Sequence, residues 1–243
     1  MNNEAEQILQ MIKSEFLPSL QKLFGSNLKS VLLYGSAARG NFRKGISDVN
    51  ILVLTETPDP ESIMQLGKSA SRIIRNKKLS LHFLTEKEFQ NSSDVFPMEY
   101  YDIKQAHVLL WGEDTLSGLI LTPENLRHQV EERLRGSVNA LRQAMLASQG
   151  RDKLLAGVLS EWYGSQTALF RGILRLLNRE EIPEQPHELV QNVAQAFEID
   201  PAGMEELISL REQKRSEKAA AVAVKVLGFL TALISKIDSM EQS

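Results

Sequence analysis

Two apolar runs joined by a turn of small residues constrain the fold of this chain more than any other feature. The first run, Val31 to Tyr34, ends at Gly35-Ser36, and the second, Ile51 to Leu54, follows directly after Asp48-Val49-Asn50. Short apolar runs bounded by turn residues are typical of buried strands. The stretch therefore predicts a strand, a tight turn with a short helix, and a second strand.

The residues between the two runs suit a phosphate and a metal ion. Gly35 has no β-carbon, so backbone there can approach a phosphate closely, and Ser36 adds a hydroxyl and a backbone N–H. Side chains alternate along a strand, so Asp48 and Asn50 share one face. Two oxygen-bearing side chains at this spacing can hold a Mg²⁺ that is also coordinated by a triphosphate.

Positive charge is concentrated in the connection between the two runs. If residues 37–39 start a helix, its N-terminus favours an anion. Arg39 and Lys44 lie in the same connection and add positive charge that can steady a phosphate. Each feature alone has a simpler explanation, since Gly-Ser after a strand is commonly a turn and Asp-x-Asn commonly caps a strand start. The joint pattern, with a strand on each side, favours a nucleotide site.

Residues 34–40 and 47–53 resemble the signature of the nucleotidyltransferase superfamily, which has the DNA polymerase beta-like fold. The resemblance is nearest to bacterial minimal nucleotidyltransferases and aminoglycoside adenylyltransferases. Their pattern is Gly-Ser, then Asp-x-Asp, then a third acidic residue on a later strand, and the three carboxylates hold two Mg²⁺. This chain matches at Gly35 and Ser36 and at Asp48, but it has Asn50 where the second carboxylate is expected.

The third carboxylate of that pattern is also missing from the expected place. A strand is predicted at 79–85, with Ser80, His82 and Leu84 on one face. The resemblance puts an acid near His82, and a histidine there can act as a general base without restoring the negative charge. The alternative is that His82 is a partly buried structural residue. Glu99 is the next candidate for the base.

The missing carboxylates bear on how strongly a metal can bind. Unit charges about 4 Å apart interact by about 4 kcal/mol at an effective dielectric constant of 20, so losing one or two anions weakens a metal site by several kcal/mol. The sequence therefore predicts a weak or single Mg²⁺ site, with Asp48 as the principal ligand and Asn50 as a neutral one.

Composition narrows the class of protein. The chain has 243 residues and no cysteine, and the absence of cysteine excludes disulfides and thiolate chemistry. Its net charge of −3 argues against a dedicated nucleic-acid binder. The polar, acidic N-terminus does not have the pattern of a signal peptide. The longest apolar stretch, 219–234, is interrupted by Lys225 and indicates a buried helix rather than a membrane span. We expect a cytoplasmic protein.

The pattern changes near the middle of the chain. Before it, helices are expected at 4–24 and 61–75, extended chain at 94–102, and further strands at 79–85 and 107–111. Beyond it, helices are expected from Thr122-Pro123 to Gly150 and at 151–178, 187–198, 201–212 and 219–237. The predicted fold class is α+β: a small mixed-sheet nucleotidyltransferase domain at 1–118, followed by an all-α bundle at 119–243.

The resemblance implies transfer of a nucleoside monophosphate from ATP or another nucleoside triphosphate to an acceptor hydroxyl, with Gly35, Ser36, Arg39 and Lys44 binding the triphosphate. The acceptor is a small molecule or a protein that the sequence does not identify. Because Asn50 and His82 replace carboxylates, the alternative is a catalytically degenerate member. Such a protein would bind nucleotide or a protein partner and regulate it, in the manner of an antitoxin.

Overall fold

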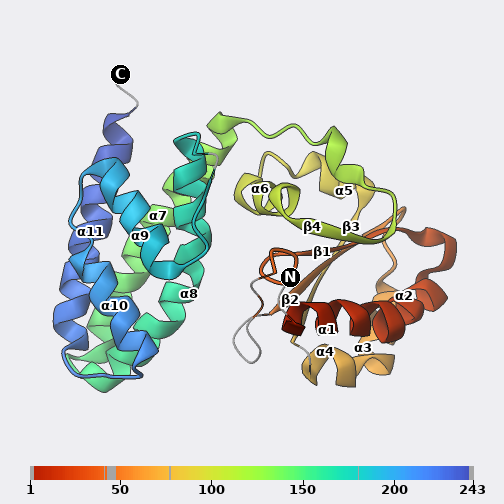
Figure 1. Cartoon of the computed structure of the whole chain (residues 1–243), viewed down its shortest axis with the longest axis horizontal. Helices are drawn as coiled ribbons and strands as arrows, with labels where there is room; N and C mark the ends of the chain where they lie inside the picture. Colours follow the sequence, from red (N-terminus) through yellow and green to blue (C-terminus); the bar gives the residue numbers. More distant parts are fainter. Residues whose placement is uncertain (1–2, 41, 43–47, 77, 180, 241–243) are drawn as a thin grey trace. The chain divides into compact units, whose positions relative to one another are not determined.

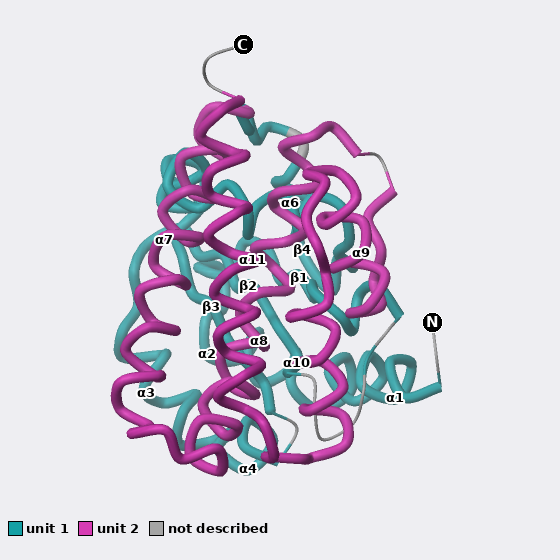
Figure 2. The backbone as a smooth tube through the Cα atoms, turned by 90° about the vertical axis from the view of Figure 1, so that its left-hand side faces the viewer, with its two compact units in different colours: residues 1–122 teal, residues 123–243 magenta. Residues whose placement is uncertain are grey.

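The chain forms two compact units, residues 1–122 and residues 123–243 (Figure 2). The computed structural model describes residues 3–40, 42, 48–76, 78–179 and 181–240. The first unit contains a sheet, and the second is helical (Figure 1). The predicted α+β class is confirmed.

A mixed sheet organises the described part of unit 1. Its strands are β1 (Leu28–Tyr34), β2 (Val49–Thr55), β3 (Leu79–Thr85) and β4 (His107–Gly112), in the order β3-β2-β1-β4. Strands β2 and β4 pair antiparallel with β1, and β3 pairs parallel with β2. The strands predicted from the apolar runs are therefore present, and the two predicted around the Gly-Ser turn are neighbours at the centre of the sheet.

The register of the sheet brings the ends of all four strands together. Tyr34, the last residue of β1, is paired with Asn50 of β2 and with His107 of β4. Asn50 is in turn level with Ser80 of β3, and His82 is level with Leu52. The turn after β1 thus begins beside the first residues of β2.

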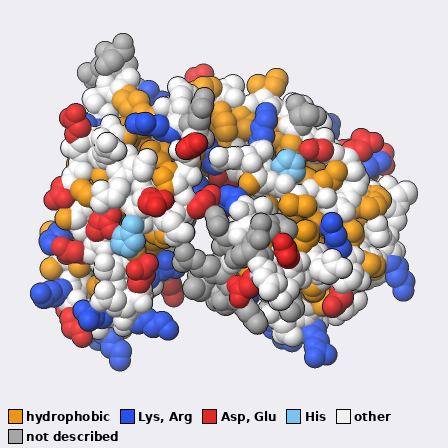
Figure 3. Space-filling model, in the orientation of Figure 1, with side chains coloured by type: hydrophobic (Ala, Val, Ile, Leu, Met, Phe, Trp, Pro, Cys, Tyr) orange, Lys and Arg blue, Asp and Glu red, His pale blue; other side chains and the backbone are white. Residues whose placement is uncertain are grey.

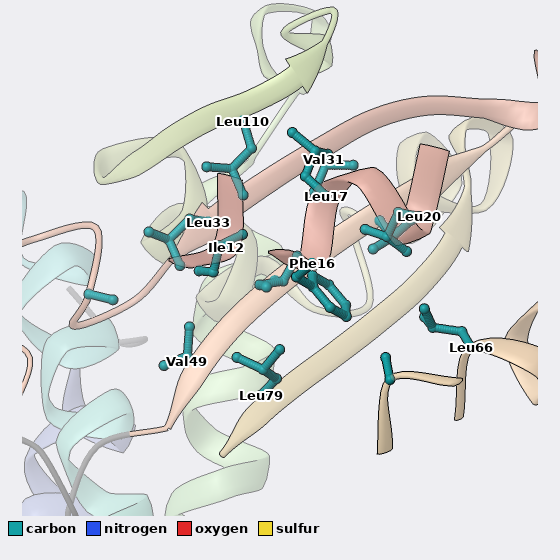
Figure 4. Close-up of a cluster of buried hydrophobic side chains, with 14 of the residues drawn as sticks. Ile12, Phe16, Leu17, Leu20, Val31, Leu33, Val49, Leu66, Leu79 and Leu110 are labelled. Carbon is teal, nitrogen blue, oxygen red and sulfur yellow. The ribbon is translucent and has the colours of Figure 1, made fainter. Parts of the chain in front are cut away.

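One face of the sheet is covered by the N-terminal helical segment. Helix α1 (Asn3–Met11) continues through the π-helical turn η1 (Ile12–Phe16) into α2 (Leu17–Phe24), and the 3₁₀ turn η2 (Gly25–Asn27) leads to β1. Side chains of this segment pack on apolar side chains of the strands, as Figure 4 shows. The buried cluster includes Ile12, Phe16, Leu20, Val31, Leu33, Val49 and Leu79. Burying each such side chain stabilises the fold by about 1.5–3 kcal/mol.

The segment predicted as one helix over 61–75 is two helices. Helix α3 (Pro60–Ser69) and α4 (Ser71–Asn76) are separated at Ala70. Asp59 caps α3 by accepting a hydrogen bond from the backbone N–H of Ser62. Leu66 of α3 packs into the same cluster as the N-terminal segment.

Two short helices supply the second cluster of buried side chains. Helix α5 (Glu86–Asn91) is capped by Thr85 through a capping box with Glu88. Helix α6 (Pro97–Gln105) occupies the region predicted to be extended, and that prediction is wrong. Phe89 and Tyr100 of these helices stack at 4.6 Å and pack with residues of β1 and β2. The 3₁₀ turn η3 (Thr115–Gly118) follows β4.

Unit 2 contains five helices within its described residues. They are α7 (Pro123–Ser148), α8 (Asp152–Leu176), α9 (Pro186–Phe197), α10 (Ala202–Glu212) and α11 (Ala219–Ser239). Gly203 of α10 shows how closely two of them pack, because a β-carbon there would lie 2.7 Å from backbone and side-chain carbon atoms of Lys225 in α11.

Helix α11 is long and apolar enough to cross a membrane by length and composition alone. It packs in the bundle, and its buried side chains include Val226, Phe229, Leu230 and Leu233. Its Lys225 forms an ion pair with Glu206 of α10 at 2.5 Å. These contacts match the buried helix that the sequence predicted.

Candidate nucleotide site

The chain turns sharply after β1, and Gly35 makes the turn possible. Gly35 is buried and has a φ of +77°, a backbone conformation that residues with a β-carbon rarely adopt. Its carbonyl accepts a hydrogen bond from the N–H of Arg39 at 3.1 Å, and the N–H of Gly40 donates to the carbonyl of Ala37 at 3.3 Å. Residues 35–40 are turns rather than the short helix we expected, so any anion here meets turn backbone, not a helix N-terminus.

The Asn50 side chain packs directly against this turn. A β-carbon built on Gly35 would lie 2.7 Å from Nδ2 of Asn50, closer than real β-carbons approach other atoms. Gly35 therefore serves two purposes: it adopts the positive φ and leaves room for the amide. The structure brings together two of the residues that the sequence placed in one site.

Asp48 lies one step outside β2 and is exposed. If the pairing of Tyr34 with Asn50 were continued, Ser36 would lie opposite Asp48. Ser36 is half-buried in the turn. The carboxylate, the serine and the amide of Asn50 are thus contributed by the two chain segments that meet at this end of the sheet.

The donor set at this end suits one metal ion at most. Mg²⁺ prefers oxygen ligands and often binds through one or two carboxylates together with substrate phosphates. Asp48 supplies one carboxylate, and the Asn50 amide supplies a neutral oxygen. Within the described residues, no group of three histidine, cysteine, aspartate or glutamate side chains is arranged to hold a metal. Among the described residues, Asp48 and Asn50 could hold a single Mg²⁺ that arrives with a triphosphate.

Arg39 and Lys44 are the two cations that the sequence predicted to bind phosphate. Arg39 lies in the turn, half-buried, with its backbone N–H bonded to Gly35. Lys44 lies outside the described residues. On the face shown in Figure 3, basic and acidic side chains are interspersed, in keeping with the net charge of −3.

His82 is exposed, so the alternative of a partly buried structural histidine is wrong. The reason is that β3 is an edge strand, so a residue at its middle is covered on fewer sides. The His82 ring meets the ring of Tyr34 edge to face, with centroids 6.1 Å apart. His82 therefore lies on the same side of the sheet as Tyr34 and is open to solvent.

Tyr34 is a residue of this region that the sequence analysis overlooked. It precedes Gly35, pairs with Asn50 and contacts His82. Burial, and then the negative charges of Glu99 and Asp102, raise the pKa of its phenol to about 12. Both acids are on α6, so this helix brings negative charge toward the end of β1. The available sequence signal was the position of Tyr34, immediately before the Gly-Ser turn.

Comparison with protein families finds a match, which lies in the first unit. Residues 13–110 match the model of the nucleotidyltransferase domain family. The match begins in η1 and ends in β4, so it includes β1, β2, β3, part of β4 and the turn at Gly35. A comparison with curated proteins finds no match.

Comparison with solved structures extends the likeness to both units. A spectinomycin adenyltransferase from Enterococcus faecialis, solved with ATP and spectinomycin, aligns over 94% of this chain and 98% of its own, with a TM-score of 0.56 and 15% identity. At that identity the likeness concerns the fold. A complex of a HEPN toxin with an MNT antitoxin from Shewanella oneidensis is also similar, over 43% of this chain and 73% of that chain, with 19% identity and a TM-score of 0.29.

Proposed function

The N-terminal unit of this chain belongs to the nucleotidyltransferase superfamily, and we propose that the protein transfers a nucleoside monophosphate from ATP or another nucleoside triphosphate to an acceptor hydroxyl. In that reaction the hydroxyl oxygen bonds to the α-phosphorus, pyrophosphate leaves, and the hydroxyl proton passes to a base. The contact between Gly35 and Asn50 carries the proposal, because it joins the turn and the start of β2 into one site beside Asp48.

Each described residue of the site has a role that its position supports, and Lys44 is assigned from the sequence alone. The turn at Gly35 and Ser36 holds the triphosphate, and Arg39, together with Lys44, offsets its charge. Asp48 is the principal ligand for Mg²⁺, and the Asn50 oxygen is a weak neutral one. When bound, Mg²⁺ neutralises phosphate charge and orients the triphosphate.

Two residues are candidates for the general base that accepts the proton of the acceptor hydroxyl. His82 is exposed and lies on the side of the sheet that carries Tyr34 and Asn50, so its imidazole is accessible to an acceptor. Glu99 is the second candidate, because its charge acts on Tyr34 from α6.

The choice of acceptor is guided by the ligand of a protein with a similar fold. The similar spectinomycin adenyltransferase was solved with a small-molecule antibiotic, and it covers nearly the whole of this chain. We therefore propose a small molecule with a free hydroxyl as the first acceptor to test, with a protein hydroxyl as the second.

The test is incorporation of label from ATP carrying ³²P at the α-phosphate. Wild-type protein is incubated with Mg²⁺ or Mn²⁺ and a panel of aminocyclitols, proteins and oligonucleotide ends. Label should enter one class of acceptor, and Asp48→Ala should abolish incorporation. The matched control is Asp94→Ala, since Asp94 is an exposed aspartate between α5 and α6. A protein whose melting temperature rises with ATP but which labels nothing would instead be a nucleotide-binding regulator.

A further inference from the structure

The Asn50 side chain is fixed at the base of the turn by the sheet around it. Asn50 is half-buried in β2 between Tyr34 of β1 and Ser80 of β3. Its amide nitrogen lies against Gly35, the first residue of the turn. The amide therefore faces the part of the site to which the triphosphate is assigned.

The polar atoms of this amide are available to a ligand. No hydrogen bond within the described part of the chain occupies the Asn50 side chain. Asn50 is only half-buried, so part of the residue is in contact with solvent. An amide NH₂ carries two donor hydrogens, whereas an ionised carboxylate can only accept.

An amide and a carboxylate at position 50 therefore interact differently with a phosphate. A carboxylate repels a phosphate unless a cation lies between them, but an amide can donate to a phosphate oxygen directly. Resting on the proposed function, we infer that Asn50 donates its Nδ2 hydrogens to an oxygen of the triphosphate, and that the site binds a triphosphate without a divalent cation. The Asn50 oxygen remains available to a metal when one is present.

The opposing effect of Asp48 is small by comparison. Asp48 is exposed, and in water its repulsion of one phosphate charge about 4 Å away weakens binding only about fivefold. A hydrogen bond to a charged partner changes affinity about ten- to a hundredfold. The amide at position 50 therefore outweighs the repulsion from Asp48 when Mg²⁺ is absent.

The experiment is calorimetric titration of the full chain with ATP and with inorganic tripolyphosphate, in EDTA and in Mg²⁺. Wild-type protein should bind both ligands in EDTA. Asn50→Asp, which removes the donors and adds one charge, should weaken binding in EDTA at least about tenfold while binding in Mg²⁺ is kept or tightened. Asn91→Asp adds the same charge at an exposed position of α5 and should leave both affinities unchanged. Thermal melts establish that each variant is folded.

The outcomes separate this inference from the proposed function. If wild-type protein binds ATP only with Mg²⁺, or if Asn50→Asp binds as well as wild type in EDTA, the inference is overturned even where label transfer occurs. If binding in EDTA depends on Asn50 but no acceptor is labelled, the inference holds and the proposed transfer fails. If no triphosphate binds in either condition, both are wrong.

Discussion

The amide nitrogen of Asn50 lies 2.7 Å from the place that a β-carbon on Gly35 would occupy, so a larger residue at position 35 would require the Asn50 side chain to move. The pair links the end of β1 to the start of β2 and sets the shape of the turn that follows. Because Gly35 also has a φ of +77°, the position is restricted by both backbone conformation and space.

The first prediction concerns the space at Gly35. Gly35→Ala should lower the free energy of unfolding by about 1–3 kcal/mol, because alanine is strained at this φ and its methyl group collides with Asn50. The same variant should lose binding of ATP as the turn is displaced. Gly67→Ala is the matched control, since Gly67 is in helix α3 with open space around its β-carbon position. Urea denaturation should show Gly67→Ala to be neutral or stabilised; equal stability for both variants would contradict the account.

The second prediction concerns His82 as the base. Replacing it by alanine should slow transfer about 10²- to 10⁴-fold, the usual contribution of a general base. Because the side chain is exposed, stability should change by no more than about 0.5 kcal/mol. His128→Ala, at an exposed position on α7, is the control. The rate of label incorporation and a thermal melt measure both effects, and an unchanged rate would assign the base to another residue, Glu99 first.

The third prediction concerns alkaline pH. The pKa of Tyr34 is raised from its ordinary value near 10 to about 12, chiefly by burial. Between these two values the unfolded chain has lost the phenol proton while the folded chain keeps it, so the contribution of Tyr34 to stability is complete below pH 10 and is lost as pH rises toward 12. Urea unfolding at increasing pH should show a shallower decline for Tyr34→Phe than for wild type. Identical declines would mean that the phenol is more open to solvent than we find.

The fourth prediction concerns His187 in unit 2. The hydrogen bond that His187 donates to the Glu205 carboxylate, together with the charges of Glu205 and Glu212, raises the pKa of His187 above its ordinary value of 6.5. The stabilisation is therefore complete below pH 6.5 and is lost as pH rises through the raised pKa. It should amount to no more than about 1 kcal/mol, because the His187 side chain is 43% exposed. NMR titration should show a lower pKa in Glu205→Gln, and an unchanged one in Glu206→Gln, whose carboxylate pairs with Lys225 instead.

The strands and bundle helices were predictable because their hydrophobic patterns are strong and local. The runs around Leu32, Leu52 and Leu110 are short and apolar, and they form the central strands and one edge of the sheet. The helix start at Pro123 follows from the preference of proline for the first turn. Such signals need no knowledge of the rest of the molecule.

The wrong predictions came from sequence patterns that are compatible with more than one local structure. Pro97 was taken to favour extended chain, but proline also suits the first turn of a helix, and burial of Tyr100 and Ile103 against the sheet decides for α6. The exposure of His82 depends on β3 being an edge strand, and strand order is not visible in local sequence. Likewise, the contact of Asn50 with Gly35 depends on the register of β1 and β2.

The most direct test of the account is an NMR titration of isotope-labelled protein with ATP and Mg²⁺. The account predicts that the largest changes occur at the backbone amides of Gly35 and Ser36 and at the side-chain NH₂ of Asn50, and that Asp48→Ala reduces them. Changes confined to unit 2, with the signals of this turn unmoved, would contradict the assignment of nucleotide to the end of β1.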